Sequence, residues 1–398
     1  MKLPADLFSK LRRSFSRGTA EEPPADENIF FTEERSAGLR DRTAAGFQNV
    51  IESSLRAWRE DPLARRIVSL TTQFSVGRGF RVSADDPASD EILHEFWEHP
   101  LNRMDARLTE WSDELCRTGN LFIMLSSDIS GMTYVRAIPA AQIEEIIPMD
   151  NDIEQPVTFR IRETALPDAV RIPEVKTVPA ASLSEPELRE CMLHFTVNRP
   201  VGGQWGEPDL APLLIWLKRY SDWLEDRTRL NHYRSSFIYL VRGTQYTETM
   251  CRQRQAQLNL RPPTPGTIMV TGDQEEWAAL NPNLDSSDAN EDGMAIKKLI
   301  AAGAGIPVSF LAESATASKA ESGGMEDSAC RNFRQRQQVL LFITETVLRH
   351  VLARSALVRR NADPRCEIRV YGDDIAAPGL SEGGIVRENT PGNGAGDE

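Results

Sequence analysis

The stretch DLAPLLIWLKRYSDWLEDRTRLNHYRSSFIYLV, residues 209–241, is the longest helix signal in the chain. Glu225 stands four residues before Arg229, a spacing that supports a helix. At 1.5 Å per residue the predicted helix spans on the order of 45 Å, longer than a compact domain usually needs. Its apolar residues recur at helical spacing and form one broad stripe: Leu213, Trp216, Leu217, Tyr220, Trp223, Leu224, Leu230, Tyr233 and Phe237.

The residues before this helix begin with predicted helices. In FQNVIESSLRAWREDPLARRIVSLTTQFSV, residues 47–76, apolar residues recur at helical spacing on both sides of Asp61 and Pro62. Asp61 is the expected N-cap of a new helix, with Pro62 in its first turn. Two glycines then predict a turn, and residues 88–118 repeat the helical periodicity.

After Gly119 the pattern changes from helix to strand. LFIMLSSDISGMTYVRAIP (121–139) contains a hairpin signal at DISG, and VTFRIRET (157–164) and CMLHFTV (191–197) predict further strands. Helices and antiparallel strands in separate stretches predict an α+β unit over about residues 43–200.

A proline-rich piece, LRPPTPGTIMVTGDQEEW (260–277), follows the long helix. Its turn residues predict a small protruding module with a short strand over residues 267–270. A second helix is expected over EDGMAIKKLIAAGAGIP (291–307), where Gly305 and Pro307 end it.

The last part of the chain predicts a connector, a helix and a strand. SATASKAESGGMEDS (314–328) is rich in small residues and joins the second helix to a third one over residues 331–356. CEIRVYG (366–372) reads as the last strand. Residues 1–42 and 376–398 are rich in charge, proline or glycine, and we expect them to be a mobile arm and a disordered tail.

Composition narrows the function classes. The chain has 398 residues and a net charge of -13, from 46 Lys plus Arg against 59 Asp plus Glu. This argues against a protein that holds nucleic acid tightly, but not against one along which DNA slides. The five scattered cysteines favour a reducing cytosol over disulfides or structural zinc. Because no signal peptide or membrane span is found, we expect a soluble chain made in the cytoplasm.

One stretch, DSSDANEDGMAIKKL, partly matches a calcium-binding loop. Asp288, Asn290, Asp292 and Gly293 fall on loop positions 1, 3, 5 and 6, but position 12 is Leu299 instead of a bidentate glutamate. A polar loop and N-cap that open a helix near Glu291 explain the residues better.

Signals of catalysis are missing from the sequence. TASKAES resembles the SxxK nucleophile motif, but Thr316 stands three residues before Lys319 and no partner motif is present. No Walker loop, GxGxxG, GxSxG or HExxH occurs, and the five histidines lack ligand spacing. We therefore expect neither enzymatic activity nor a metal or other cofactor.

The long helix carries basic residues that could contact phosphate: Lys218, Arg219, Arg227, Arg229 and Arg234. Asp222, Glu225 and Asp226 are interleaved with them, which favours a solvated or interface-paired helix face.

The order of these elements resembles the portal protein fold of tailed bacteriophages. WGEPDLAPLLIWLKRYSDWLEDRTRLNHYRSSFIYLV (205–241) is similar to the portal segment in which a short turn leads into the stem helix. AIKKLIAAGAGIPVSFLAESATASKAESGGMEDSACRNFRQRQQ (295–338) is similar to the second stem helix, tunnel loop and following wing helix. The resemblance covers about residues 43–375.

This resemblance implies a division of the chain. It assigns residues 43–208 to an α+β wing, 209–241 to a stem helix, 242–287 to the clip, 288–306 to a second stem helix, 307–325 to the tunnel loop region, and 326–375 to a wing helix and terminal strand. The chain has little sequence after Tyr371, so a helical crown is expected to be short or absent.

The resemblance also implies three groups of site residues. The tunnel loop would place Ser314, Thr316, Ser318, Lys319, Glu321 and Ser322 at the DNA channel. The stem and subunit interface would contain Trp216, Tyr220, Trp223, Arg227, Tyr233, Lys297 and Lys298. The clip would bind partners through Arg261, Pro262, Pro263, Pro265 and Trp277.

The implied function is a ring-shaped channel at the capsid vertex of a virion. Portal proteins are usually dodecamers that conduct double-stranded DNA during packaging and ejection. Their expected partners are the terminase large subunit, a head-to-tail connector protein and the major capsid or scaffolding protein, with no membrane.

Two alternatives remain open. A metal-dependent DNA-processing enzyme would use Asp285, Asp288, Asp292 and nearby glutamates as ligands, and magnesium-dependent cleavage would identify it. Another phage connector or capsid protein would differ in ring size and shape under the electron microscope.

Overall fold

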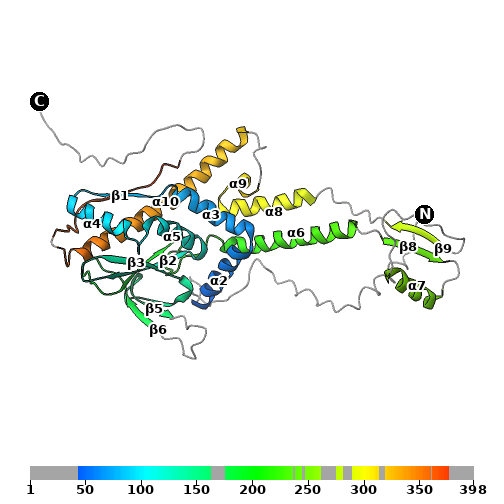
Figure 1. Cartoon of the computed structure of the whole chain (residues 1–398), viewed down its shortest axis with the longest axis horizontal. Helices are drawn as coiled ribbons and strands as arrows, with labels where there is room; N and C mark the ends of the chain where they lie inside the picture. The colour runs from blue at the N-terminus through cyan, green and yellow to red at the C-terminus, as the bar shows by residue number, and fades with distance from the viewer. Residues whose placement is uncertain are drawn as a thin grey trace. The chain divides into compact units, whose positions relative to one another are not determined.

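The computed structural model describes residues 44–162, 175–235, 238–243, 247–260, 275–280, 289–312, 319–359 and 361–375. Its helices and strands confirm the α+β class expected from the sequence (Figure 1). The chain forms two compact units. Of the described residues, unit 1 contains 44–60, 71–211 and 337–373, and unit 2 contains 61–70, 212–336 and 374–375.

The predicted N-terminal helices are present as α2 (Ala44–Glu60) and α3 (Pro62–Val76). Asp61 Oδ1 accepts hydrogen bonds from the backbone amides of Leu63 and Ala64 at 2.7 and 3.0 Å, which confirms its role as N-cap. The next two helices are α4 (Pro87–Glu98) and α5 (Met104–Thr118).

The described strands of unit 1 form three antiparallel sheets. The first has the order β3 (Thr133–Ile138), β2 (Asn120–Ser127), β7 (Cys191–Thr196). The second has the order β4 (Ile143–Met149), β5 (Asp152–Arg162), β6 (Val175–Pro179), with the short 3-10 helix η2 (Ala140–Gln142) before it. The third pairs β1 (Arg81–Ala84) with β10 (Ile368–Tyr371). The hairpin expected at DISG and the strands expected after it are therefore confirmed.

Two apolar clusters of described residues form the core of unit 1. In the larger one, Trp111 and Leu108 of α5 pack with Leu121 of β2 and Leu348 of α10 (Lys319–Ser355), all fully buried. In the smaller one, Phe47 of α2 packs with Phe122, Phe159 and Trp205. The buried apolar residues of these helices and sheets thus pack against one another within the unit.

Unit 2 contains α6 (Leu214–Ser235), β8 (Ile238–Gly243), α7 (Glu248–Leu260), β9 (Glu275–Leu280), α8 (Ala289–Ala304) and α9 (Val308–Ala312), with the 3-10 helix η3 (Ala211–Leu213) before α6. β8 and β9 pair antiparallel. Among the described residues, no helix is long and apolar enough to cross a membrane.

The long helix is shorter than its sequence pattern suggests. The expectation of a helix over 209–241 is wrong at both ends, because α6 covers only Leu214–Ser235. Pro212 disfavours a continuous α-helix before it, and Ile238–Val241 pair with β9 instead. Isoleucine, tyrosine and valine also favour strands, so a partner strand can override the helical spacing.

The predicted connector is also shorter than expected, because α10 already begins at Lys319. Residues 319–325 are therefore helical despite Gly323 and Gly324. Extending an existing helix adds one hydrogen bond per residue without a new nucleus, and Lys, Ala, Glu and Met offset the two glycines. The strand expected over 267–270 lies outside the described residues.

Candidate functional site

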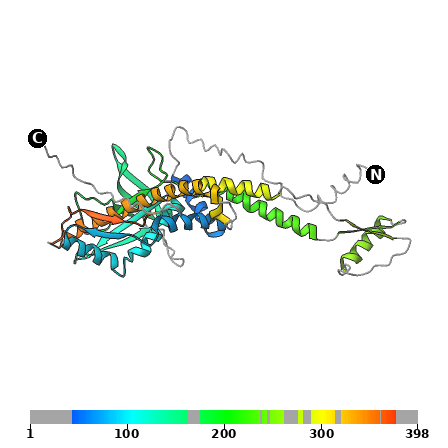
Figure 2. The ribbon, with the colours of Figure 1, turned by 90° about the horizontal axis from the view of Figure 1, so that it is seen from above.

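The helices α6 and α8 form an antiparallel hairpin in unit 2. They run side by side in Figure 1 and in the view turned by 90° (Figure 2). Two glycines of α8 face this contact: a Cβ at Gly293 would lie 2.4 Å from the Trp223 ring of α6, and one at Gly303 would lie 2.6 Å from Cδ2 of Leu213 in η3. A larger residue at Gly293 would force the Trp223 ring or the helices to shift.

Aromatic and cationic side chains line the hairpin. The rings of Tyr220 and Trp223 stack at 5.8 Å with an interplanar angle of 16°. Lys297 Nζ lies 5.5 Å from the centre of the Tyr220 ring, and the Arg219 guanidinium lies 4.7 Å from that of Trp216. These cation–π contacts stabilise the positive charges of Lys297 and Arg219 where they lie against the aromatic rings.

Burial in the hairpin is confined to a narrow strip. Leu213 and Leu217 are 2% exposed and Ile300 is fully buried. By contrast, Leu224 of α6 and Leu299 of α8 are 44% and 43% exposed. Among the expected interface residues, Trp216, Tyr220, Trp223, Arg227 and Lys297 are half-buried and Lys298 is exposed, while the side chain of Tyr233 lies outside the described residues.

The outer side of α6 carries charge of both signs. Asp222, Glu225 and Asp226 are exposed. Arg229 forms an ion pair with Glu225 at 2.5 Å and lies 3.9 Å from Asp226, and all three side chains are more than half exposed. Such pairs contribute little to the stability of one chain. In the single chain this face is solvated, as the interleaved charges predict.

The end of α8 is a defined turn. Gly305 has φ of +67° and its amide donates to the carbonyl of Ala302, while the amide of Ile306 donates to the carbonyl of Ala301. This αL cap confirms that Gly305 ends the helix. Asn332 Nδ2 donates to the Gly305 carbonyl at 3.3 Å. Nothing in the local sequence pattern of Asn332 indicates this contact.

The calcium-loop residues that the structure describes lie in helix α8. Asn290 and Asp292 are exposed and Gly293 packs on Trp223, whereas Asp285 and Asp288 lie outside the described residues. The part of the chain that the structure describes contains no cluster of three or more potential metal ligands.

The residues expected in the tunnel loop and the clip do not come together in the described part of the chain. Ser314, Thr316 and Ser318 lie outside the described residues, as do Arg261, Pro262, Pro263 and Pro265. Lys319, Glu321 and Ser322 are in the first turns of α10 instead of the expected loop. Trp277 is in β9, opposite Val241 of β8.

The WGEPD segment that precedes the long helix is fixed to unit 1 by Asn120. The Asn120 side chain accepts from the Gly206 amide and donates to the Gly206 carbonyl, both at 2.9 Å. It also donates to the Thr118 carbonyl at 2.8 Å and contacts His194 Nε2 at 3.2 Å. Asp209 donates its amide to the Cys116 carbonyl at 3.0 Å. Sequence reasoning missed Asn120, because a single asparagine after a helix carries no distinctive signal.

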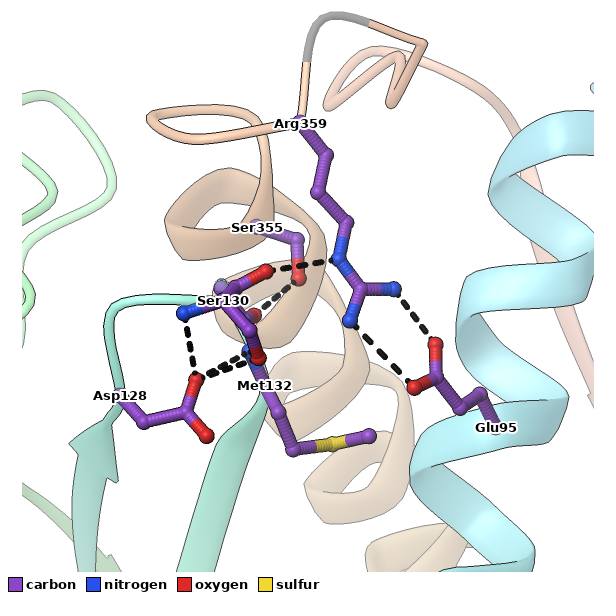
Figure 3. A network of polar contacts seen from close by, with 7 residues as sticks. Glu95, Asp128, Ser130, Met132, Ser355 and Arg359 are labelled. Atoms are coloured by element: carbon purple, nitrogen blue, oxygen red, sulfur yellow. Dashed lines mark hydrogen bonds and ion pairs between the residues drawn. The ribbon is translucent and has the colours of Figure 1, made fainter.

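The C-terminal end of α10 is tied to the β2–β3 hairpin. Arg359 pairs with Glu95 at 2.5 Å and donates to the Ser130 carbonyl, and Ser355 Oγ donates to the Gly131 carbonyl (Figure 3). Asp128 Oδ1 accepts from the Ser130 amide within the hairpin. These contacts connect α4, the β2–β3 hairpin and the C-terminal end of α10.

Arg354, the residue before Ser355, is almost fully buried. Its guanidinium donates to Ser127 Oγ, Cys191 Sγ and the carbonyls of Leu188 and Arg189, at 2.7 to 2.8 Å. Burial raises the pKa of the Cys191 thiol despite this neighbour. A protonated thiol is a poor nucleophile, so the arrangement favours a structural role.

Two histidines of unit 1 are held neutral. Burial lowers the pKa of His194 to about 3, with a smaller effect of the Arg199 charge. Its ring stacks on Phe122 at 4.2 Å. Burial also lowers the pKa of His350 to about 4, with a smaller effect of Arg354. Neither ring is available as a proton carrier near neutral pH.

No family model and no curated protein matches this sequence. Solved structures, however, share its fold. The neck of a native gene transfer agent particle, computed with C12 symmetry, contains a chain of 12% identity that matches with a TM-score of 0.53 over 80% of this chain and 83% of that one. A chain of the native particle's virion is 11% identical, with a TM-score of 0.54 over 84% of both chains.

A third match is in the neck of the empty particle, computed with C6 symmetry. Its chain is 13% identical and has a TM-score of 0.54 over 83% of this chain and 84% of that one. The likeness extends over most of both chains in each case. At these identities it shows a common fold.

Proposed function

We propose that this chain is a portal subunit, one copy of a ring through which double-stranded DNA enters and leaves a phage-like capsid. The observation that carries the proposal is the common fold, over 80–84% of each chain, with chains of gene transfer agent necks and virions. One neck was computed with C12 symmetry, which supports a ring of twelve copies. A structural role at the head-to-tail junction of a virion is the broader form of the same proposal.

In the proposed ring, neighbouring copies pack through the α6–α8 hairpin. The exposed Leu224 and Leu299 supply apolar contacts. The acidic side of α6, with Asp222 and Glu225, faces Lys298 on α8 of the next copy. This heterologous contact repeats around the ring until it closes. The half-buried Trp216 and Tyr220 would then become fully covered, as aromatic residues often are at interfaces.

The channel is proposed to pass DNA without holding it. Each neutralised phosphate adds salt-dependent affinity that would slow sliding, and a chain with net charge -13 limits that affinity. We assign the channel lining to residues 313–324, where Lys319 is the only cation and Glu313 and Glu321 flank it. Attraction to DNA there is local and screened by salt.

The proline-rich stretch around residues 261–277 is the proposed docking site for the terminase large subunit and the connector protein. Pro262, Pro263 and Pro265 fix an extended path and lack amide donors, which suits a protruding edge that a partner can bind. Capsid or scaffolding protein would contact unit 1, which we assign as the wing. No catalytic step is assigned to this chain.

Electron microscopy and mass photometry of the purified full chain test the proposal. We expect closed rings of about twelve copies with a central channel, as the C12 likeness predicts. A strictly monomeric species at every salt and protein concentration would contradict the portal assignment. A ring or shell without a DNA-sized channel would favour another connector or capsid protein.

Packaging assays separate the functional parts. Replacement of residues 261–266 by a Gly/Ser linker should leave unit 1 folded and abolish DNA packaging. Crosslinking of DNA in filled particles to a cysteine at Ser318 should exceed that at an exposed position in unit 1. Magnesium-dependent cleavage of DNA by the purified chain would instead favour the metal-dependent enzyme.

A further inference from the structure

The β4–β5 hairpin extends beyond the core that covers its base. Phe159 and Ile161 of β5 are 0% and 6% exposed, whereas Ile153 and Val157 are 49% and 46% exposed. Met149, at the end of β4, is 51% exposed and lies opposite Asp152. In Figure 1, β5 lies at the margin of unit 1. Three large apolar side chains are therefore uncovered around the end of this hairpin, Ile153 and Val157 on one face of the sheet and Met149, which pairs with Asp152, on the other.

The same end of the hairpin is acidic. The stretch MDNDIEQ, residues 149–155, carries Asp150, Asp152 and Glu154, all exposed, and no basic residue. Arg199 pairs with Glu154 at 3.1 Å, so the tip keeps a net negative charge. A partner for this surface needs apolar side chains together with positive charge.

Residues 2–17 of the same chain, KLPADLFSKLRRSFSR, have this chemistry. Their apolar residues recur at a spacing of about one helical turn: Leu3, Leu7, Leu11 and Phe15, with Phe8 beside them. Five basic residues stand against the single Asp6: Lys2, Lys10, Arg12, Arg13 and Arg17. The segment is thus complementary to the hairpin tip in both charge and apolar character.

The start of the described chain lies next to the base of this hairpin. Gln48, in the second turn of α2, donates through Nε2 to the carbonyl of Ile143 at 2.9 Å, and Ile143 is the first residue of β4. From Ile143 to Met149 a strand rises by roughly 20 Å. About 26 residues link position 17 to Ala44, and a flexible chain of that length has an end-to-end distance of about 28 Å. The segment can therefore reach the tip of its own hairpin.

We propose that residues 2–17 dock on the distal end of the β4–β5 hairpin of the same chain, through Met149, Ile153 and Val157 and the carboxylates of Asp150, Asp152 and Glu154. Tethering raises the local concentration of the segment to the millimolar range, so even weak intrinsic affinity gives a populated contact. The proposal does not rest on the portal assignment.

Photocrosslinking in the full chain tests the contact. A photoreactive amino acid replaces Phe8, and mass spectrometry identifies the crosslinked peptide, which we expect to contain residues 149–157. The same amino acid at Phe31 is the positional control. The triple variant Asp150→Asn/Asp152→Asn/Glu154→Gln should reduce the Phe8 crosslink by about fivefold, and about 1 M salt should have a similar effect.

A matched charge control is available on α4 and α5. Glu91→Gln/Glu98→Gln/Glu110→Gln removes three exposed carboxylates elsewhere in unit 1 and should leave the crosslink unchanged. Circular dichroism checks that both triple variants are folded. Crosslinks of Phe8 outside the hairpin, or equal crosslinking in the two triple variants, would overturn the proposal. Crosslinks that join isotope-labelled with unlabelled chains would overturn the arrangement within one chain.

Discussion

Unit 1 and the α6–α8 hairpin use similar side chains in opposite ways. In unit 1 the large residues close a core of their own, and Trp111, Phe96 and Leu108 are fully buried. In the hairpin Trp216, Tyr220 and Trp223 remain half-buried, and Leu224 and Leu299 are largely exposed. The core of unit 1 therefore buries its large side chains within the unit, whereas the α6–α8 hairpin leaves aromatic and leucine side chains that another molecule can cover. Stability should depend on the first region and assembly on the second.

The largest expected effect is at Asn120. Asn120→Ala removes the partner of the Gly206 amide and carbonyl, the Thr118 carbonyl and His194. Unsatisfied buried groups should lower the free energy of unfolding of unit 1 by about 3–5 kcal/mol. Urea denaturation measures the change. Asn151→Ala, at an exposed turn, is the matched control, and equal stability of the two variants would show that the Asn120 contacts contribute little.

Acidification should destabilise unit 1 through its two buried histidines. Because burial lowers the pKa of His194 and His350 to about 3 and 4, the unfolded chain binds more protons below about pH 6.5. The contribution of these two neutral histidines to the free energy of unfolding is complete above pH 6.5 and is lost as the pH falls toward 4. From pH 7 to pH 5 we expect a loss of about 1–2 kcal/mol per histidine.

Histidine variants isolate this effect in denaturation curves at several pH values. His194→Gln and His350→Gln should each flatten the dependence of stability on pH between 7 and 5. His94→Gln, at a side chain that is 55% exposed, is the control. An unchanged pH dependence in both buried-site variants would show that other groups govern acid stability.

A substitution inside the α6–α8 hairpin should affect ring assembly more than it affects the stability of unit 1. Gly293→Val places side-chain atoms where the Trp223 ring lies, so the ring or the two helices must shift, at a local cost of about 1–3 kcal/mol. We expect mass photometry to show fewer closed rings, and the free energy of unfolding of unit 1 to stay unchanged. Ala256→Val, at an exposed position of α7 outside the proposed contact between copies, is the matched control. Equal loss of rings in both variants would show that the packing of α6 on α8 does not control assembly.

The smallest effect on the single chain is expected at Lys298. This side chain is exposed, so Lys298→Glu should change the stability of one chain by less than about 0.5 kcal/mol. Repulsion from Asp222 and Glu225 of the next copy should nevertheless weaken the ring. The double variant Lys298→Glu/Glu225→Lys reverses both charges of the proposed pair, so it should restore part of the ring assembly. If all three proteins form rings equally at low salt, the proposed pairing between copies does not exist.

The sequence predicted elements best where the signal was local. Asp61 before Pro62 marks a helix start and Gly305 a helix end, and both are confirmed because capping depends on a few neighbouring residues. The hairpin at DISG is confirmed for the same reason.

Predictions failed where distant residues decide the structure. Residues 238–241 continue the helical spacing, but pairing with β9 makes them a strand. Residues 319–325 have the composition of a loop, but they extend α10. The channel and clip residues stay predictions, because Ser314–Ser318 and Arg261–Pro265 lie outside the described residues.

By itself the sequence determined the α+β class, the helix and strand signals and the acidic balance of the chain, because periodicity, capping and charge are properties of short stretches. Only the tertiary structure decided that Asn120 fixes the WGEPD segment, that Arg354 is buried among carbonyls, and that Gly293 packs against the Trp223 ring of α6. Each of these contacts joins residues at least 65 positions apart in the chain. Such pairs share no local pattern, so they become visible only when packing brings them together.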